Sequence, residues 1–207
     1  RACGYLTAQA ANYYHNWVKK QEWAPSLGLS QERWDVHAVY LPEMAIDLDS
    51  EATRLRAIMD EIGNVNIFLS EGAGVEESIA EKEANGEEVE RDPFGHVKLD
   101  TINHGQWFAK MFADKIGAEK VMVQKSGYFS RAWHANADDL RLIKGMVDLA
   151  VECAYAGKPG VVGHDEENGN VLTSIPFPRI KGHKAFDITQ DWFVETMSEL
   201  GQEVTGR

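Results

Sequence analysis

The stretch SEATRLRAIMDEIGNVNIFLSEG, residues 50–72, contains the two patterns that decide the fold. Its first part has apolar residues at helical spacing, which predicts a helix over about 50–62. Gly63 is a typical C-terminal stop for such a helix, and the apolar run 65–69 behind it predicts a strand. A helix that leads directly into a buried strand is typical of α/β proteins. The apolar positions of the helix are Leu55, Ile58, Met59 and Ile62.

The same alternation of helix and strand continues in both directions from this stretch. It predicts an α/β fold with a mostly parallel, Rossmann-like sheet flanked by helices. The last two strands are expected to form a hairpin through Glu167-Asn168-Gly169. Helices are predicted over about 6–20, 103–116, 136–156 and 187–200, and strands over 36–41, 120–124, 161–164 and 170–175.

Composition and charge exclude several classes of protein. The chain has 207 residues, with 21 Lys and Arg against 33 Asp and Glu, which gives a net charge of −12. Nucleic acids and anionic membranes both select clustered basic residues, so neither is an expected partner. The sequence contains no apolar stretch long enough to span a membrane. Cys3 and Cys153 form no metal-type pair, and a reducing cytoplasm is the expected location. Because the chain starts at Arg1 without a leader-like segment, we treat it as a fragment of a longer protein.

Polar residues follow three of the predicted strands. These loops are 41–44, which contains Glu43; 70–74, which contains Glu71 and Gly72; and 125–131, which contains Tyr128 and Arg131. Ligands bind at the carboxyl edge of open parallel sheets. A carboxylate accepts hydrogen bonds from sugar hydroxyls, and an Arg fork suits a phosphate. Together the loops predict a sugar-phosphate site.

Each of these features also has a structural interpretation. Glu43 could be a solvated turn residue, and Arg131 could pair on the surface with Asp138 or Asp139. Glu71 could cap a following helix. The run 164–167 resembles a hard-cation site, although such a cluster before Asn168-Gly169 is more often an exposed turn. The acidic segment 76–92 is typical of a solvated surface, with a metal or partner site as the alternative.

Six segments, which together span almost the whole chain, resemble the diphosphate-dependent branch of the bacterial phosphofructokinase family, in its C-terminal half. The third member of the family's Met-Gly-Arg substrate motif falls on Arg1. The diphosphate-using Tyr-x-x-Arg falls on Tyr128 and Arg131, where ATP-using relatives have Gly-His-x-Gln-Arg-Gly-Gly. The carrying segments are 1–7, 39–43, 66–72, 124–131, 163–166 and 177–182.

The resemblance implies roles for individual residues. Glu43 is expected to bind hydroxyls of fructose 6-phosphate, and Arg1 belongs to the same substrate site. Tyr128 and Arg131 are expected at the sugar phosphate, and we include Phe129 and Ser130 between them among the substrate-binding residues. The chain departs from the pattern at Met122, where relatives often have a basic residue that reaches a neighbouring subunit's phosphate.

The resemblance also implies what this chain lacks. In the family, the donor loop, the Mg²⁺-binding Asp and the catalytic base all precede the Met-Gly-Arg motif, so we assign no catalytic residue and no metal ligand here. The chain is expected to be the fructose 6-phosphate side of a diphosphate-using phosphotransferase and to be inactive alone. Its expected partners are diphosphate, the N-terminal half of the same enzyme and further copies in a homo-oligomer.

A division into domains follows from the same resemblance. Residues 1–131 with about 183–207 would form the fructose 6-phosphate-binding domain, and 132–182 would pack on the donor domain. Two other classes of function stay open at this point. One is a non-catalytic sugar-phosphate-binding or regulatory module, and the other is a structural interaction domain that uses the acidic segment 76–92.

Overall fold

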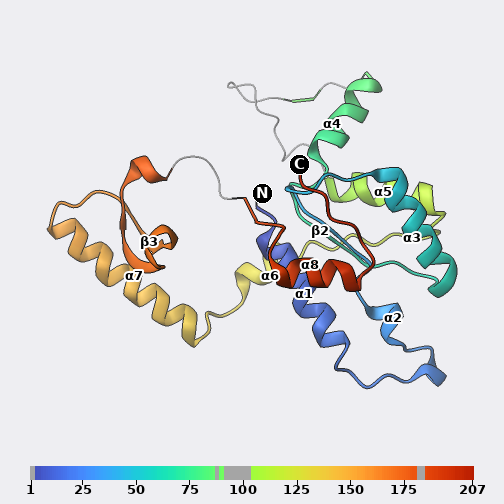
Figure 1. Ribbon diagram of the computed structural model, residues 1–207, viewed down its shortest axis with the longest axis horizontal. Coiled ribbons are helices and arrows are strands. Elements are labelled where there is room, and N and C mark those ends of the chain that lie inside the picture. Colours follow the sequence, from blue (N-terminus) through green and yellow to red (C-terminus); the bar gives the residue numbers. More distant parts are fainter. Residues whose placement is uncertain (1–2, 87–88, 91–103, 181–184) are drawn as a thin grey trace. The chain divides into compact units, whose positions relative to one another are not determined.

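The computed structural model describes residues 3–86, 89–90, 104–180 and 185–207 (Figure 1). The chain divides into two compact units. Unit 1 contains residues 1–123 and 184–207, and unit 2 contains residues 124–183. None of the helices in the described ranges is both long and apolar enough to cross a membrane.

A parallel strand pair lies at the centre of unit 1. β1 (Ala38–Tyr40) runs beside β2 (Ile67–Leu69), with Val39 opposite Phe68. The connection between them contains α3 (Leu48–Ile62), whose first turn is capped by the Asp47 carboxylate. The helix ends at Gly63, which has a φ of 81° and therefore takes a conformation that glycine adopts readily. The helix, its stop and the strand predicted from residues 50–72 are confirmed.

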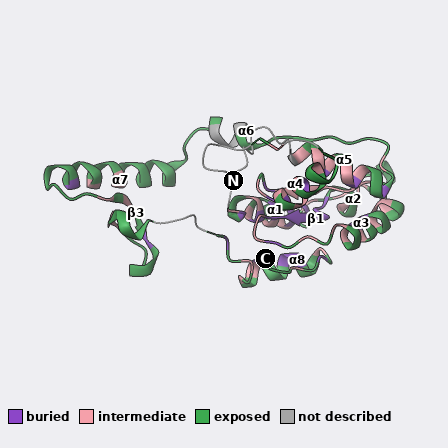
Figure 2. Cartoon of the chain, turned by 90° about the horizontal axis from the view of Figure 1, so that it is seen from above, coloured by how far each residue is buried: buried purple, intermediate pink, exposed green. Residues whose placement is uncertain are grey.

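Helices cover both faces of this strand pair. Because strand side chains alternate between faces, Val39 lies in one apolar cluster and Tyr40 lies in the other. The first cluster adds Ala8 and Ala11 of α1 (Tyr5–Val18) and Phe193 and Met197 of α8 (Asp191–Glu199), and the second adds Leu55 of α3 and Phe108 of α5 (His104–Ile116). Figure 2 shows the buried residues concentrated around β1. The remaining helical elements of unit 1 are α1 (Tyr5–Val18), η1 (Pro25–Leu27), α2 (Gln31–Trp34), α4 (Val75–Ala84), α5 (His104–Ile116) and α8 (Asp191–Glu199).

The backbone N–H and C=O of Val39, which form no hydrogen bond with β2, are bonded to a side chain instead. The Gln202 Oε1 atom accepts the backbone N–H of Val39 at 2.8 Å, and its Nε2 donates to the Val39 carbonyl at 3.1 Å. Gln202 is buried, so these bonds satisfy polar groups inside the unit.

Unit 2 contains a long helix packed on a hairpin. α7 (Ala137–Tyr155) begins with a capping box formed by Asn136 and Asp139. β3 (Val161–Asp165) and β4 (Val171–Ile175) pair antiparallel, which confirms the predicted hairpin. The other elements are α6 (Gly127–Ala132), η2 (Glu166–Asn168) and η3 (Phe177–Arg179).

The predicted sheet is only partly confirmed. The fold is α/β with a small parallel sheet, but the described residues contain no continuous Rossmann-like sheet. The strand predicted over 120–124 is wrong, because these described residues have no strand conformation. Their apolar side chains are exposed, with Met122 at 83%, and a strand needs a neighbouring strand for its hydrogen bonds. The segment 127–132, expected as part of a loop, is α6.

The acidic segment 76–92 falls partly on α4. Its residues up to Ala84 form a helix with exposed acidic positions such as Glu76 and Glu81, in agreement with a surface segment. Residues 87–88 and 91–92 lie outside the described ranges.

Candidate functional site

The Glu43 carboxylate lies just beyond the end of β1 and accepts backbone hydrogen bonds from two distant segments. Its Oε1 accepts the N–H of Gly4 at 3.0 Å and the N–H of Phe186 at 2.7 Å. Its Oε2 lies 3.2 Å from the same Gly4 nitrogen. Glu43 does lie in a turn, but it is half-buried and hydrogen-bonded to two other segments, so it is not simply a solvated residue.

Gly4 fits beside this carboxylate because it has no side chain. A Cβ at this position would lie 2.7 Å from Oε2 of Glu43 and 2.8 Å from Cβ of Leu41. Both distances are shorter than a van der Waals contact. Glycine therefore allows the segment after Arg1 to approach the end of β1.

The Glu43 carboxylate keeps the capacity to bind a ligand. A carboxylate offers about four lone-pair positions, and two amide donors do not fill them. Among the described residues, Oε2 makes only the longer contact with Gly4, so it can accept a further hydroxyl hydrogen. Oε1 of Glu43 can therefore keep its backbone hydrogen bonds while Oε2 accepts one from a ligand.

Three residues before Glu43, the last residue of β1 belongs to a largely buried polar group. The hydroxyl of Tyr40 donates to Oε2 of Glu51 at 2.7 Å, and Arg54 donates to both carboxylate oxygens of Glu51. Burial, followed by the charge of Glu51, raises the pKa of Tyr40 above its ordinary value, so the phenol stays protonated. No motif in the sequence indicates this group, which provides the buried Tyr40 hydroxyl with a hydrogen-bond partner.

A cavity of about 320 Å³ lies beside this polar group in unit 1. Its walls include the carboxylates of Asp47, Glu51 and Glu203. Like charges repel, so this cavity is unsuited to a phosphate. Glu43 is not among its lining residues.

The other predicted site residues lie on α6 or outside the described residues. Tyr128 and Arg131 are three residues apart in α6, which places the two positions on one side of the helix. Phe129 is 68% exposed. Arg1 and the side chains of Tyr128, Ser130 and Arg131 lie outside what the structure describes.

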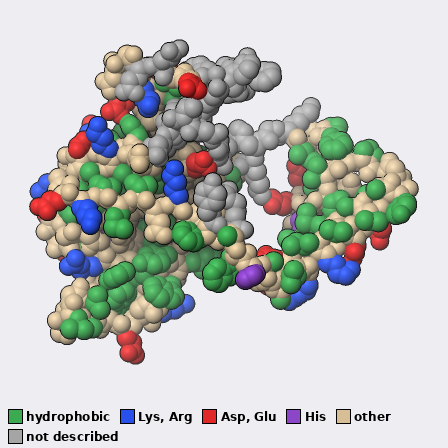
Figure 3. Space-filling view, turned by 180° about the vertical axis from the view of Figure 1, so that it is seen from behind, with side chains coloured by type: hydrophobic (Ala, Val, Ile, Leu, Met, Phe, Trp, Pro, Cys, Tyr) green, Lys and Arg blue, Asp and Glu red, His purple; other side chains and the backbone are tan. Residues whose placement is uncertain are grey.

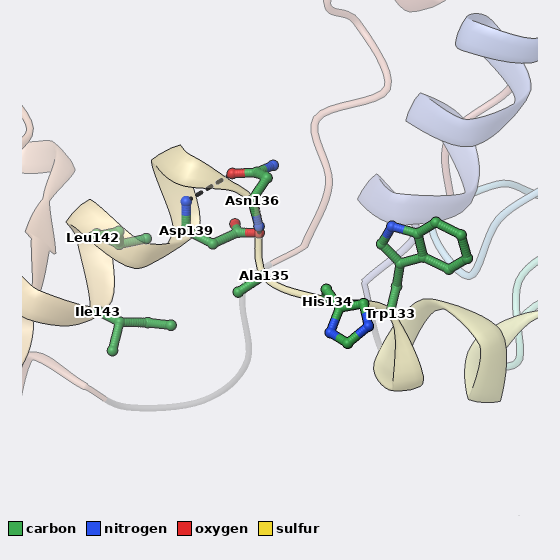
Figure 4. Close-up of a pocket in the computed structure, with 7 residues that line it drawn as sticks. All are labelled: Trp133, His134, Ala135, Asn136, Asp139, Leu142 and Ile143. Atoms are coloured by element: carbon green, nitrogen blue, oxygen red, sulfur yellow. Dashed lines mark hydrogen bonds between the residues drawn. The ribbon is translucent and has the colours of Figure 1, made fainter.

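The two proposed ion-pair partners of Arg131 already have other contacts. Asp138 pairs with Arg141 at 3.0 Å. Asp139 accepts the Asn136 N–H at 3.0 Å and donates its own N–H to the Asn136 side chain (Figure 4). Asn136 and Asp139 line a cavity of about 470 Å³ in unit 2 with Trp133, His134, Ala135, Leu142 and Ile143.

The structure favours the turn interpretation of the run 164–167 over a cation site, because Glu166–Asn168 form the short exposed helix η2. The buried Asp165 carboxylate accepts two hydrogen bonds from the Arg179 guanidinium, at 2.6 and 2.7 Å, and Glu167 accepts another at 2.5 Å. The hydrogen bonds from Arg179 lower the pKa of Asp165 to about 2, so it stays ionised. Among the described residues, no group of three or more His, Cys, Asp or Glu side chains could hold a metal ion.

Comparison with known proteins adds the decisive observation. No family model matches the chain. Over 202 residues, it is 61% identical to pyrophosphate–fructose 6-phosphate 1-phosphotransferase of Mastigamoeba balamuthi. The aligned region covers 98% of this chain and 49% of the relative. Over 207 residues, it is 58% identical to the enzyme of that name from Methylomonas methanica, covering 100% of this chain and 51% of the relative. This chain matches half of a pyrophosphate–fructose 6-phosphate 1-phosphotransferase.

The resemblance to the diphosphate-dependent phosphofructokinases is therefore confirmed over the whole chain. A third phosphotransferase of this name, from Propionibacterium freudenreichii subsp. shermanii, is 56% identical over 98% of this chain and 50% of the relative. The chain spans about half the length of these curated relatives.

Two residues at the Glu43 carboxylate were missed by reasoning from the sequence. Gly4 and Phe186 contribute backbone amides, and a backbone amide carries no residue-type signal. Gly4 does lie within 1–7, one of the segments that carry the phosphotransferase resemblance. Phe186 lies in none of them.

Proposed function

We propose that this chain is the acceptor-substrate half of a phosphotransferase that moves phosphate from diphosphate to fructose 6-phosphate. The product would be fructose 1,6-bisphosphate, and the reaction would serve glycolysis in the cytoplasm. The observation that carries the proposal is the match of the entire chain to half of the named relatives, at 55–61% identity for the four most extensive matches.

Within this proposal, Glu43 and the α6 residues bind the sugar phosphate. Glu43 would accept hydrogen bonds from sugar hydroxyls through Oε2, while Oε1 keeps its backbone contacts. Arg131 would bind the phosphate through a bidentate fork, and Tyr128 would donate its hydroxyl to it. Arg1, Phe129 and Ser130 complete the proposed substrate-binding set. These residues hold and orient the acceptor, which is a large part of catalysis in phosphoryl transfer.

The proposal places the donor chemistry outside this chain. The described residues include no group that fits a metal ion, so we derive no step through Mg²⁺ from them. We propose that the Mg²⁺ ligands, the diphosphate-binding loop and the catalytic base belong to the N-terminal half of the enzyme. As a separate part of the proposal, the complete enzyme forms a homo-oligomer.

Unit 2 has an exposed surface that suits the proposed docking of residues 132–182 on that N-terminal half. α7 exposes four apolar side chains at helical spacing, and Figure 3 shows hydrophobic side chains on the surface of this unit. An apolar stripe of this kind usually packs against another element. Its members are Leu140, Ile143, Val147 and Val151, which are 50–58% exposed.

The test is complementation between the two halves. The purified chain, given diphosphate, fructose 6-phosphate and Mg²⁺, should show no turnover. Addition of a separately produced N-terminal half should restore it. Turnover by this chain alone, or no turnover from the mixture although the halves associate, would contradict the proposal. Binding of fructose 6-phosphate with no effect of the added half would instead support the non-catalytic binding module.

A further inference from the structure

The turn that contains Glu43 is paired with residues 205–207. The N–H of Arg207 donates to the Glu43 carbonyl at 3.2 Å. The N–H of Ala45 donates to the Thr205 carbonyl at 2.9 Å. The two stretches pair antiparallel, so they hold each other as two short strands do. The backbone of Glu43 is therefore held by a segment that is distant in the sequence.

The Arg207 side chain extends this contact to α4. Its Nε donates to the Met44 carbonyl at 3.0 Å. Its Nη2 lies 2.9 and 2.8 Å from the two carboxylate oxygens of Glu77, and its Nη1 lies 3.2 Å from Glu76. Both acids belong to the first turn of α4, and the chain end marked C lies beside this helix (Figure 1). One guanidinium thus joins the Glu43 turn to the start of α4.

Glu77 is the carboxylate that fixes the Arg207 guanidinium. The side chains of Arg207 and Glu77 are 26% and 25% exposed, whereas that of Glu76 is 80% exposed. Water screens an exposed ion pair, so the contact with Glu76 contributes little. Charge-assisted hydrogen bonds to a more sheltered carboxylate hold their partners more firmly. The acidic segment 76–92 therefore contributes one side chain to the internal structure of unit 1.

Arg207 connects two of the loops that follow strands. The Glu43 turn follows β1, and α4 begins directly after the loop 70–74, which follows β2. Because β1 and β2 are parallel, their carboxyl ends lie at the same edge of the sheet. A side chain that holds the turn to α4 therefore also holds Glu43 in place at that edge.

The position of the Glu43 carboxylate depends on restraints at both ends of the residue. The amides of Gly4 and Phe186 hold Oε1, which restrains the end of the side chain. The bonds from Arg207 restrain the backbone of the turn, from which the side chain extends. Oε2 keeps one position only when both restraints are present. Small displacements of a positioned group weaken its contact with a substrate.

We propose that Arg207 is a positioning residue for fructose 6-phosphate, which holds the Glu43 turn to α4 so that Oε2 keeps its orientation toward the sugar hydroxyls. This role rests on the proposed function of Glu43 as a substrate-binding residue. Arg207 acts through Glu43 and makes no contact with the sugar. Without the Arg207 side chain, the turn loses its link to α4 and the acceptor sugar is bound more weakly, while the donor side is unchanged.

Arg207→Ala in the complete enzyme tests the proposal by separating KM from kcat. KM for fructose 6-phosphate should rise about three- to tenfold, because a displaced carboxylate forms a weaker hydrogen bond. The kcat and the KM for diphosphate should stay within about twofold of wild type. Arg33→Ala is the matched control, since Arg33 lies at an exposed position of α2 and its described hydrogen bonds use only its backbone carbonyl. A normal KM for fructose 6-phosphate in Arg207→Ala, whatever its Tm, would overturn the proposal.

A double-mutant cycle shows whether Arg207 acts through Glu43. Glu43→Ala removes the carboxylate, so the addition of Arg207→Ala should raise KM no further. Effects that multiply independently would overturn the positioning role. A normal KM in Glu43→Ala would instead remove Glu43 from the substrate site, and the positioning role with it. Failure of the proposal and failure of the proposed function are thereby distinguished.

Two further measurements cover the case in which Glu43→Ala does not fold. Glu77→Gln weakens only the link to α4, and it should raise KM for fructose 6-phosphate less than Arg207→Ala does. Hydrogen exchange at the amides of Gly4 and Phe186 should accelerate several-fold in the 207-residue Arg207→Ala chain, because the carboxylate that accepts them is less firmly held. Unchanged exchange, or a normal KM in Glu77→Gln, would overturn the proposal.

Discussion

Phe186 donates its backbone N–H to Oε1 of Glu43 at 2.7 Å, although the two residues are 143 positions apart in the chain. The same oxygen accepts the N–H of Gly4, which is 39 positions away on the other side. Glu43 therefore fastens the beginning of α1 and the approach to α8 to the end of β1. A residue expected only to bind substrate also joins three parts of unit 1.

Glu43→Gln should lower both stability and substrate affinity. The glutamine side chain keeps one acceptor oxygen but has no charge. Its NH₂ group cannot accept the backbone N–H groups of Gly4 and Phe186 that the carboxylate accepts. We expect a loss of about 1–2 kcal/mol in the free energy of unfolding, or about 2–8 °C in Tm.

In the complete enzyme, the same variant should weaken fructose 6-phosphate by about 1–3 kcal/mol in apparent affinity. Melting curves of this chain and KM values of the complete enzyme measure the two effects separately. Glu61→Gln, at an exposed position of α3, is the matched control and should change neither. A normal KM would remove Glu43 from the substrate site and leave only its structural role.

Gly4→Ala should destabilise unit 1 without removing any polar group. The new Cβ would lie 2.7 Å from the Glu43 carboxylate, so the backbone must shift. Overpacking of this kind costs about 1–3 kcal/mol. Gly163→Ala is the control, because its Cβ would meet nothing closer than 3.9 Å. Denaturant unfolding should separate the two variants, and equal stabilities would argue against the close approach of Gly4 to Glu43.

Arg131→Ala in the complete enzyme should weaken fructose 6-phosphate far more than diphosphate. Loss of charge-assisted hydrogen bonds to a phosphate costs about 1.5–3 kcal/mol, which is about ten- to more than a hundred-fold in affinity. Tyr128→Phe removes one neutral hydroxyl and should cost less. Arg141→Ala, which breaks an exposed pair with Asp138, serves as the control. Unchanged affinity in both α6 variants would show that this helix does not bind the sugar phosphate.

Asp165→Asn should loosen the β3–β4 hairpin. Because Arg179 lowers the pKa of Asp165 to about 2, the stability from this pair is complete above the ordinary value of 3.8. It is lost as pH falls through about 2. Hydrogen exchange at the hairpin amides should therefore be faster in Asp165→Asn at neutral pH. Asp148→Asn, on the exposed surface of α7, should exchange like wild type, and identical protection in both variants would contradict the role of the Arg179 pair.

Local signals made much of the fold predictable. Gly63 ended α3 as expected, Asn136 capped α7, and turn residues near Gly169 marked the hairpin. Each signal acts within a few residues of the backbone it controls, so the sequence displays it directly. The strand expected over 120–124 had the right residue types but no adjacent strand, and composition does not reveal pairing partners.

The candidate site was less accessible to this reasoning. The position of Glu43 after a strand was correct, because Pro42 follows closely on β1. Its two amide donors come from distant parts of the chain and carry no side-chain signature. The acidic run near Asp165 suggested a cation because Arg179, its real partner, lies 14 positions away. Non-local contacts of this kind follow from the tertiary fold.

The pairing of Gln202 with Val39 has a consequence for how this sheet can grow. An open strand edge is a template for further strands, including those of other molecules. Here a side-chain amide mimics one peptide unit of an additional strand and fills the outward-facing positions of β1. A third strand could be added at Val39 only by expelling a buried side chain. The edge of the sheet at Val39 is therefore covered by a buried side chain rather than guarded by a charged one. Gln202 blocks edge-to-edge association of this short apolar strand with another molecule.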